Sequence, residues 1–463
     1  MMNLATWAHV AQGTLVGEDR PVASVCTDSR SLKAGDVFFA LRGPNFDGHE
    51  YLAAVAEAGA AAAVVQRLDS TLCLPQILVD DTVAALGKIA SYWRNQKFHG
   101  TLFAITGSCG KTTVKGMLKS ICEQAGFTLA TAGNLNNHIG VPLTLMQLQP
   151  SHQFAVIEMG ASGLGEIAYL TELAKPNIAL VNNVMPAHIQ GFGSLAAIRE
   201  EKLRIFDGLS VGGTAVVNLD DAYSDDVYAA QARTCAYRTV GFSLHPQAVS
   251  PAGLFSHAID ARALNSGAWA FNWLVEDALV PIELAVLGKH NVANALAAAS
   301  MAFAAGISTS AIQTGLAQFG GEKGRMQAKI APTGAILIDD TYNANPGSVA
   351  AAIAYLAERP GERILVLGDM KELGEGALAE HAAIGRLAKN AGIDQLFTCG
   401  DLSTAAAQAF GVGGQHFLNQ QELLNILKPK LVRSVSCLIK GSRSAHMEQI
   451  VESLLANGPT REQ

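Results

Sequence analysis

The sequence has few charged residues, few aromatic residues and no excess of basic residues. Charged residues make up 16% and aromatic residues 6%, and 33 Lys and Arg against 40 Asp and Glu leave a net charge of −7. Hydrophobic residues reach 49%, so the chain can form a core and disorder is excluded as its main state. Without a basic excess, no general field attracts nucleic acid or an anionic membrane. Any phosphate-binding site must therefore be local.

Paired cysteines and membrane-spanning runs are also missing. The seven cysteines are odd in number, widely spaced and without a CxxC pair, which argues against a disulfide scaffold or a zinc ribbon and fits a reducing compartment. The first ten residues contain no Lys or Arg, so we expect no secretory signal. The most apolar run, Ala53 to Val65, is interrupted by Glu57 and is too short to cross a bilayer. These absences predict a cytoplasmic protein without membrane insertion.

The chain is long and rich in glycine, which predicts several domains with many tight turns. It has 463 residues and 45 glycines, and at roughly 100–200 residues per domain it should form about three domains. We place them at residues 1–98, 99–322 and 323–463. The first should be a small α/β unit. It has two strands within Val22 to Arg42, a helix at His49 to Ala58, a strand near Ile77 to Val79, and a helix from the cap Asp81 to about Asn95.

The two later blocks alternate short apolar strands with helices, the pattern of parallel sheets with crossover helices. In the central block we expect strands at Leu102–Thr106, Phe154–Ile157, Ile178–Val181 and Thr214–Val217, then a β-rich insertion at 236–286 and a helix at Asn291–Ala305. In the third, Rossmann-like and doubly wound block we expect Ala335–Ile338, Arg363–Leu367, Gln395–Cys399 and Ser436–Ile439. The fold class is therefore α/β, with a site expected between the two blocks.

A glycine-rich loop between a strand and a helix carries the strongest chemical signal. In Thr106 to Thr113, the backbone of Gly107, Ser108, Cys109 and Gly110 could cradle phosphates at the helix N-terminus. Lys111 would reach the β- and γ-phosphates, Thr112 would ligate Mg²⁺, and Thr113 would complete the loop. The spacing is shorter than GxxxxGK[ST], because Ile105 stands where the first glycine belongs. The alternative is a glycine-rich turn with a surface lysine.

Three further residues could serve a metal. Glu158 ends a strand and could hold Mg²⁺, although a strand-end glutamate is commonly a surface residue. His188 follows another strand end, where a metal ligand and a hydrogen-bonded structural histidine are equally compatible with the pattern. Lys202, taken alone, is a solvated lysine on a helix.

Together, the loop, the segment Asn134 to Gly140, Glu158, His188 and Lys202 resemble the Mur ligase family, in which the short loop is usual. The resemblance implies a carbamylated Lys202. It also implies that Thr112, Glu158, His188 and Lys202 form an Mg²⁺ site. Asn136 and Asn137 would lie near a nucleotide-sugar substrate.

The resemblance continues downstream. In Gly288 to Ala295, it implies that Asn291 and Asn294 reach the adenine of ATP; taken alone they could cap or solvate a helix. It implies that Arg325 contacts the γ-phosphate and that Asp340, with Asn343 in the same loop, meets the ribose. Alone, these would be a linker charge and an Asx-rich turn. The catalytic set is then Lys111, Lys202, His188 and Arg325.

The first domain resembles those family members that bind a UDP-sugar. The matching residues lie in Asp28 to Arg30, Gly35 to Gly43 and Asn45 to His49. The resemblance implies substrate contacts by Ser29, Arg30, Arg42 and Asn45, although exposed arginines are usually just solvated.

The third domain indicates which branch of the family the chain resembles. The Asp-Asn-Pro-Arg motif of the diaminopimelate-adding branch is absent. Gly368 to Glu375, His381 and Lys440 to Glu448 resemble the branch that adds D-Ala-D-Ala to UDP-MurNAc-tripeptide in peptidoglycan synthesis. The resemblance implies an ATP- and Mg²⁺-dependent ligase with an acyl-phosphate intermediate, and we expect it to act as a monomer. Lys440 and Arg443 are candidates for the dipeptide carboxylate on charge alone.

Alternatives are a diaminopimelate-adding ligase or a folylpolyglutamate synthetase in the same superfamily. Other classes are a phosphate-loop switch that hydrolyses ATP only to change shape, and a noncatalytic scaffold.

Overall fold

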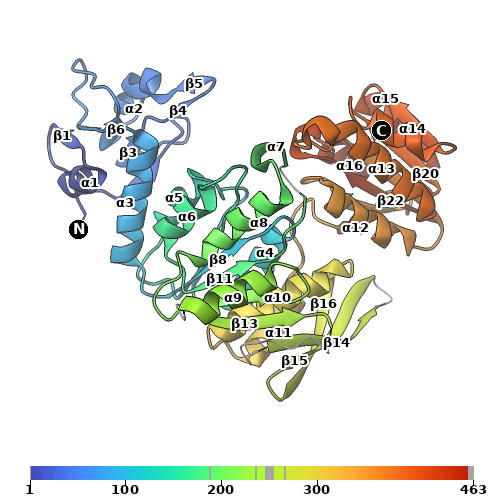
Figure 1. The fold of residues 1–463 in the computed structure, drawn as a ribbon. Helices are drawn as coiled ribbons and strands as arrows, with labels where there is room; N and C mark the ends of the chain where they lie inside the picture. The colour runs from blue at the N-terminus through green and yellow to red at the C-terminus, as the bar shows by residue number, and fades with distance from the viewer. Residues whose placement is uncertain (1, 187–188, 235–236, 246–254, 265–266, 457–463) are drawn as a thin grey trace, which may run out of the picture.

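A computed structural model describes residues 2–186, 189–234, 237–245, 255–264 and 267–456, and it contains three successive units, each built on its own main sheet. The units follow one another from blue through green and yellow to red in Figure 1. Within the described residues, no helix is both long and apolar enough to cross a membrane.

The first unit is a five-stranded sheet in the order β1-β7-β6-β3-β2, with a separate two-stranded hairpin. Its strands are β1 (Thr14–Val16), β2 (Ser24–Cys26), β3 (Asp36–Phe39), β4 (Arg42–Gly43), β5 (Phe46–Asp47), β6 (Ala62–Val65) and β7 (Gln76–Leu78). Its helices are α1 (Leu4–Ala11), a 3-10 turn (Gly48–Tyr51), α2 (Leu52–Glu57) and α3 (Thr82–Lys97). The predicted cap of α3 is confirmed, because the Asp81 carboxylate accepts the N–H groups of Val83 and Ala84.

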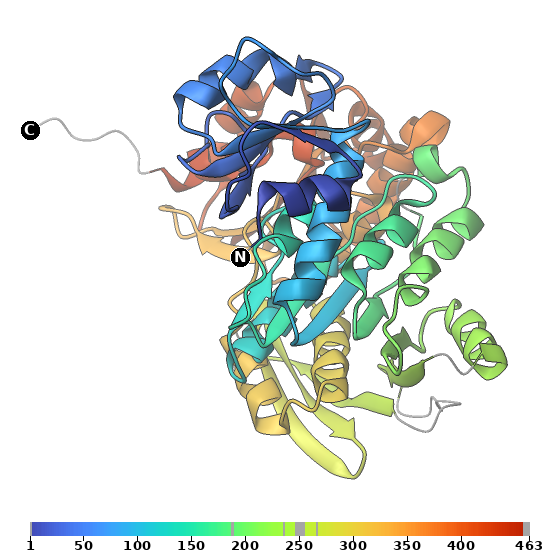
Figure 2. The same ribbon diagram turned by 90° about the vertical axis from the view of Figure 1, so that its left-hand side faces the viewer.

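Helix α3 joins the first unit to the central one. The Trp93 indole donates to the Leu148 carbonyl at 3.0 Å, and α3 packs on α5 (Gly140–Leu145) and α6 (Glu166–Ala174). Figure 2 shows α3 running alongside the central unit below the first sheet. One continuous hydrophobic core therefore spans both units.

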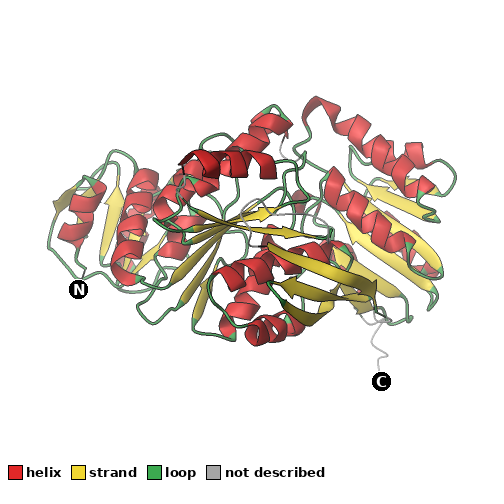
Figure 3. Ribbon diagram, turned by 60° about the horizontal axis from the view of Figure 1, so that its bottom comes forward, coloured by secondary structure: helices red, strands yellow, loops and turns green. Residues whose placement is uncertain are grey.

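The central unit is a nine-stranded sheet in the order β16-β15-β14-β13-β12-β11-β8-β10-β9. Its parallel part comprises β8 (Thr101–Thr106), β9 (Thr128–Ala130), β10 (Phe154–Glu158), β11 (Ile178–Val181), β12 (Thr214–Asn218) and β13 (Arg238–Ser243). Helices α4 (Lys111–Glu123), α7 (Ile189–Phe192), α8 (Leu195–Leu203), α9 (Ser224–Thr234), α10 (His290–Ala304) and α11 (Thr309–Gln318) accompany it, as Figure 3 shows in red around the yellow sheet. All four strands predicted here before residue 236 are present.

The expected insertion at 236–286 is β-rich but is not an insertion. Its strands β14 (Phe255–Ala263), β15 (Ala268–Val275) and β16 (Ala278–Leu287) continue the central sheet, β14 parallel to β13 and the last two antiparallel. Trp273 and Phe271 on β15 are buried in the same core as α4 and α10. Of the prolines and glycines that suggested an insertion, Gly241 and Pro281 lie within strands, and Pro246, Pro251 and Gly253 lie outside the described residues.

The third unit is a six-stranded sheet in the order β17-β18-β22-β19-β20-β21. Its strands are β17 (Gln327–Ile330), β18 (Ile336–Asp340), β19 (Glu362–Gly368), β20 (Gln395–Cys399), β21 (Gly414–Phe417) and β22 (Val435–Lys440). Its helices are α12 (Pro346–Ala357), α13 (Ala377–Asn390), α14 (Thr404–Phe410), α15 (Gln420–Leu427) and α16 (Glu448–Leu455). The four predicted strands are confirmed, and all but the antiparallel β17 pair in parallel.

Candidate functional site

The glycine-rich loop lies between β8 and α4, as predicted. Gly107 and Gly110 have φ angles of 152° and 80°, so both need the freedom of glycine. The Lys111 ammonium folds back and donates to the Gly107 carbonyl at 2.8 Å. The loop backbone therefore adopts a conformation that depends on glycine, and the side chain of Lys111, at the start of α4, folds back over it.

Two asparagines at the end of the neighbouring strand β11 hold this loop. Asn183 accepts the Cys109 N–H at 2.8 Å and donates to the Cys109 carbonyl at 3.1 Å, to which Asn182 also donates at 2.9 Å. The Asn183 carbonyl accepts the Ser108 N–H. Sequence reasoning did not assign either asparagine a role. The available signal was their place at the carboxyl end of a strand beside β8.

Glu158 and Thr112 meet behind the loop. Thr112 Oγ1 donates to Glu158 Oε1 at 3.2 Å, and the Asn136 amide donates to the same oxygen at 2.9 Å. Glu158 is only 2% exposed, and its Oε2 has no hydrogen-bond partner among the described residues. A buried carboxylate oxygen without a partner is costly unless a cation or a donor completes it.

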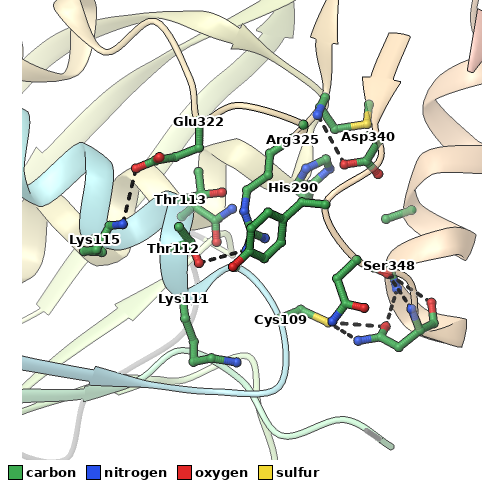
Figure 4. A pocket seen from close by; sticks show the side chains of 18 of the residues that line it. Cys109, Lys111, Thr112, Thr113, Lys115, His290, Glu322, Arg325, Asp340 and Ser348 are labelled. Atoms are coloured by element: carbon green, nitrogen blue, oxygen red, sulfur yellow. Dashed lines mark hydrogen bonds and ion pairs between the residues drawn. The ribbon is translucent and has the colours of Figure 1, made fainter. Parts of the chain in front are cut away.

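Arg325 crosses from the third unit to this point. Its guanidinium donates to Thr112 Oγ1 at 2.9 Å and lies 4.2 Å from the centre of the Tyr342 ring. Figure 4 shows the side chain reaching from the upper strands down to Thr112. A residue that would be a linker charge in isolation thus touches the loop.

Lys202 is buried rather than solvated. It lies on α8, is 3% exposed, and its side chain has no ion pair or hydrogen bond among the described residues. Desolvation lowers its pKa to about 7, and Lys111 adds to the shift. Burial also lowers the pKa of Lys111, against the opposing effect of Glu158. The interpretation of Lys202 as a solvated helix residue is therefore wrong.

At the carboxyl edge of the third sheet, Asp340 and Lys440 form a buried pair. Lys440 Nζ donates to Asp340 Oδ2 at 2.6 Å and to the Asn343 carbonyl at 2.9 Å, and Asp340 Oδ1 accepts the Met326 N–H. Lys440 is 3% exposed, so it is committed to Asp340 rather than open to a dipeptide. Arg443 is exposed and pairs with Glu448 at 3.1 Å.

A cavity of about 1430 Å³ is lined by residues from both units, although the buried Lys202 is not among them. Besides the loop, Glu158, Arg325 and Asp340, it is lined by Asn136, Asn137, Asn291, Asn294, Asn343, Lys440 and Arg443. His290 and Lys115 also line it and were not predicted; Lys115 pairs with Glu322 at 3.6 Å (Figure 4). Asn137 additionally caps α5 by accepting the Gly140 N–H.

The four predicted substrate residues of the first unit do not line this cavity. Ser29 and Arg30 follow β2, where Arg30 pairs with Asp28 at 2.7 Å, and Arg42 pairs with Asp47 at 3.4 Å. Asn45 is exposed beside Arg42. His188, predicted as a catalytic and metal residue, lies outside the described residues.

The motif at residues 368–381 forms hydrogen bonds within the third unit. Asp369 accepts the N–H groups of Leu402 and Ser403 at 3.0 and 2.8 Å, and its carbonyl accepts from Ser442. His381 is fully buried and accepts the Met370 N–H at 2.9 Å. These residues connect the loops at the carboxyl edge of the third sheet.

Comparison with known families matches three successive parts of the chain. Residues 21–94 match the "Mur ligase family, catalytic domain", residues 105–302 the "Mur ligase middle domain", and residues 324–443 the "Mur ligase, glutamate ligase domain".

Individual proteins match over nearly the full length. The UDP-N-acetylmuramoyl-tripeptide--D-alanyl-D-alanine ligase of Escherichia coli (strain K12) is 41% identical over 463 residues, which cover 99% of each chain. A crystal structure of MurF from Acinetobacter baumannii is 33% identical with a TM-score of 0.88, covering 97% of this chain and 98% of that one. MurF from Thermotoga maritima in complex with ADP is 26% identical with a TM-score of 0.81, covering 94% and 97%. The chain belongs to the Mur ligase family.

Proposed function

We propose that this protein is the ATP-dependent ligase that joins D-Ala-D-Ala to UDP-MurNAc-tripeptide, a step in peptidoglycan precursor synthesis. The observation that carries the chemistry is the convergence of Thr112, Glu158 and Arg325 in one cavity. Full-length similarity to ligases of that name supports the choice of substrates. We further propose the domain boundaries 1–98, 99–322 and 323–463, a monomer, and a place in the cytoplasm, where ATP is available.

The residues present fit Mg²⁺. Glu158 offers a buried carboxylate oxygen without a described partner, and the Thr112 hydroxyl lies beside the same carboxylate. Both are oxygen donors, which Mg²⁺ prefers. Thr112, Glu158 and Lys202, as its carbamate, would hold the ion, with His188 as a further ligand. When bound, Mg²⁺ supplies positive charge against the phosphates.

A carbamate on Lys202 is consistent with its environment. Carbon dioxide reacts with a neutral amine, and the lowered pKa of Lys202 leaves a large neutral fraction near neutral pH. The product is an anion, which replaces a buried cation beside Lys111 by a group of opposite charge. The modification would thus relieve the repulsion between two lysines and add a carboxylate-like ligand.

The reaction then proceeds in two transfers. An oxygen of the terminal tripeptide carboxylate attacks the γ-phosphorus, the bond to ADP breaks, and an acyl phosphate forms. The amine of D-Ala-D-Ala next attacks the acyl carbon, the bond to phosphate breaks, and the amine loses its proton. The chain contributes mainly by positioning anions and neutralising charge.

Named residues take these roles. The loop from Gly107 to Thr113 would bind the phosphates, Lys111 and Arg325 would neutralise charge at the γ-phosphate, and Asp340 with Asn343 would face the ribose. Asn291 and Asn294 would reach the adenine. Asn136 and Asn137, together with Ser29, Arg30, Arg42 and Asn45 in the first unit, would bind the UDP-sugar peptide.

The direct test is ADP release measured with each substrate omitted in turn. We expect release that requires ATP, UDP-MurNAc-tripeptide and D-Ala-D-Ala together, with one bond formed per ADP. Equal turnover without D-Ala-D-Ala would contradict the ligase and favour a nucleotide switch. If ADP release instead required diaminopimelate and a UDP-MurNAc substrate that carries only two amino acids, the chain would belong to another branch of the family.

A further inference from the structure

A chain of buried side-chain amides runs from the phosphate-binding loop to the start of α10. Asn182 Nδ2 donates to the Cys109 carbonyl at 2.9 Å and to Asn294 Oδ1 at 3.1 Å. Asn294 Nδ2 donates to Asn291 Oδ1 at 2.8 Å, and Asn291 Nδ2 donates to the Leu287 carbonyl at 2.6 Å. The three asparagines are 4–6% exposed, so each amide must find its partners inside the protein.

The hydrogen bonds fix which way each amide faces. A backbone carbonyl can only accept, so Cys109 and Leu287 each require an NH₂ group at the two ends of the chain. Between these ends, an inverted Asn294 would place its NH₂ against the NH₂ of Asn182 and its oxygen against the oxygen of Asn291. The orientation of Asn294 is therefore set from two sides, by Asn182, which the loop orients, and by Asn291, which the Leu287 carbonyl orients.

The loop backbone also packs closely on these two amides. A Cβ atom added at Gly110 would lie 2.5 Å from both Asn182 Nδ2 and Asn294 Oδ1. The backbone at Gly110 therefore lies directly against the contact between these two amides. Asn183 holds the same Cys109 backbone, and no hydrogen bond between Asn183 and Asn294 is found in the described part of the chain.

We propose that Asn182 is a specificity-determining positioning residue, which locks the Asn294 amide so that the site accepts adenine and rejects hypoxanthine. The two bases have the same shape, but adenine carries an amino donor where hypoxanthine carries a carbonyl acceptor, and the adjacent ring nitrogen changes from acceptor to donor. An amide that turns over exchanges its donor and acceptor in the same way. This inference rests on the proposed placement of adenine at Asn291 and Asn294.

The physical basis is the cost of an unmatched hydrogen bond. A site that presents fixed donors and acceptors rejects an analogue with the opposite pattern, because buried polar groups are then left unpaired. A site whose amide is free to turn over accepts both bases. Fixing the amide through Asn182 therefore couples base selection to the same loop that binds the phosphates.

The test compares the binding of ADP and inosine diphosphate by calorimetry, using the full-length protein with Mg²⁺. In the wild type we expect inosine diphosphate to bind about tenfold or more weakly, the value of one or two unmatched hydrogen bonds. In Asn182→Ala, Asn294 keeps only the bond to Asn291, so the inverted amide becomes less costly and the ratio of the two Kd values should fall. In Asn182→Asp, which has the same shape but only acceptors, a carboxylate oxygen faces Asn294 Oδ1, so the ratio should fall further.

Asn183→Ala is the matched control, because it removes contacts to the same Cys109 peptide but none to Asn294. It should weaken both nucleotides equally and leave the ratio unchanged. Equal weakening of both nucleotides by the Asn182 variants would overturn the inference, as would a wild type without preference. Thermal unfolding checks that each variant folds. If Asn182→Ala does not fold, the isosteric Asn182→Asp alone tests the inference. Because this binding needs no peptide substrate, a wrong ligase assignment would show in the ADP-release assay and not here.

Discussion

At the carboxyl edge of the central sheet, Glu158 keeps one oxygen without a described partner. Lys202, on α8 and outside the cavity lining, has no described ion pair either, although its charge is repelled by that of Lys111 in the loop. At the carboxyl edge of the third sheet, Asp340 and Lys440 satisfy each other at 2.6 Å in an equally buried setting. Both edges line the same cavity. Buried polar groups are normally paired. The unpaired groups of the central edge can therefore bind a ligand, whereas the paired groups of the third edge already bind each other.

The difference fits a division of labour between the units. Groups that meet developing charge must be available to the ligand, whereas groups that position a ligand benefit from a rigid arrangement before it binds. Arg325 belongs to the third unit but crosses to Thr112, so it joins the central edge in function. The comparison predicts that variants of the central-edge groups lining the cavity change rate first, whereas variants at the third edge change stability first.

The largest effect is expected for Lys111→Met. Losing the ammonium from the centre of the loop should lower kcat by about 10³-fold, because charge on the transferring phosphoryl group is then left uncompensated. ADP release under saturating substrates measures this, and thermal unfolding should stay near the wild type. The matched control is Lys119→Met on the same helix, where the lysine is half-exposed and pairs with Glu123. An equal loss in both variants would contradict the role of Lys111.

At the third edge, Lys440→Met should lower the free energy of unfolding by about 3 kcal/mol. The change leaves the Asp340 carboxylate buried without its counter-ion, and an uncompensated buried charge is costly. Urea unfolding of the full chain measures this, with the exposed Lys428→Met as the control. An unchanged stability together with a large fall in kcat would show that Lys440 acts on the substrates and would remove the contrast between the two edges.

Sequence patterns predicted the strands that approach the site, because short apolar runs between helices mark a buried parallel sheet. They missed β6, whose four residues, Ala62 to Val65, are all buried and follow directly on an alanine-rich helical run. Because polar and apolar residues do not alternate in such a run, its pattern does not distinguish a strand from a helix. The expected insertion failed for a related reason, since sheet membership depends on pairing across a long separation in sequence.

The site was predicted less completely than the fold. The loop and Glu158 have local signals, but the burial of Lys202 and the pairing of Asp340 with Lys440 depend on side chains brought from other elements. The loop-holding asparagines Asn182 and Asn183 have no distinctive sequence signal, because each acts through hydrogen bonds that strand order creates. The sequence therefore predicted residues with a local chemical signal, but it did not predict which charged side chains are buried or paired in the fold.

At the central edge, Lys202→Ala should lose about 10- to 100-fold in kcat, the usual cost of removing a group that supports a metal site. Added short-chain carboxylic acids should restore part of that rate, because a carboxylate can occupy the space of the lost carbamate. The same acids should not raise the rate of the wild type or of Lys111→Met. A variant that the acids leave unchanged would argue against a carbamate.

The last effect concerns stability alone and is a pH dependence measured in bicarbonate-free buffer. The Lys202 amine has a pKa of about 7 in the folded chain and 10.5 in its ordinary state, so between these values the unfolded chain binds one more proton. The free energy of unfolding should therefore rise as pH increases through this window and be lost as pH falls toward 7. Lys202→Met lacks this contribution, so urea unfolding at both ends of the window should show a smaller rise for the variant. Equal rises would mean that Lys202 is not desolvated, and the central edge would then hold no unpaired buried cation to set against the Asp340–Lys440 pair.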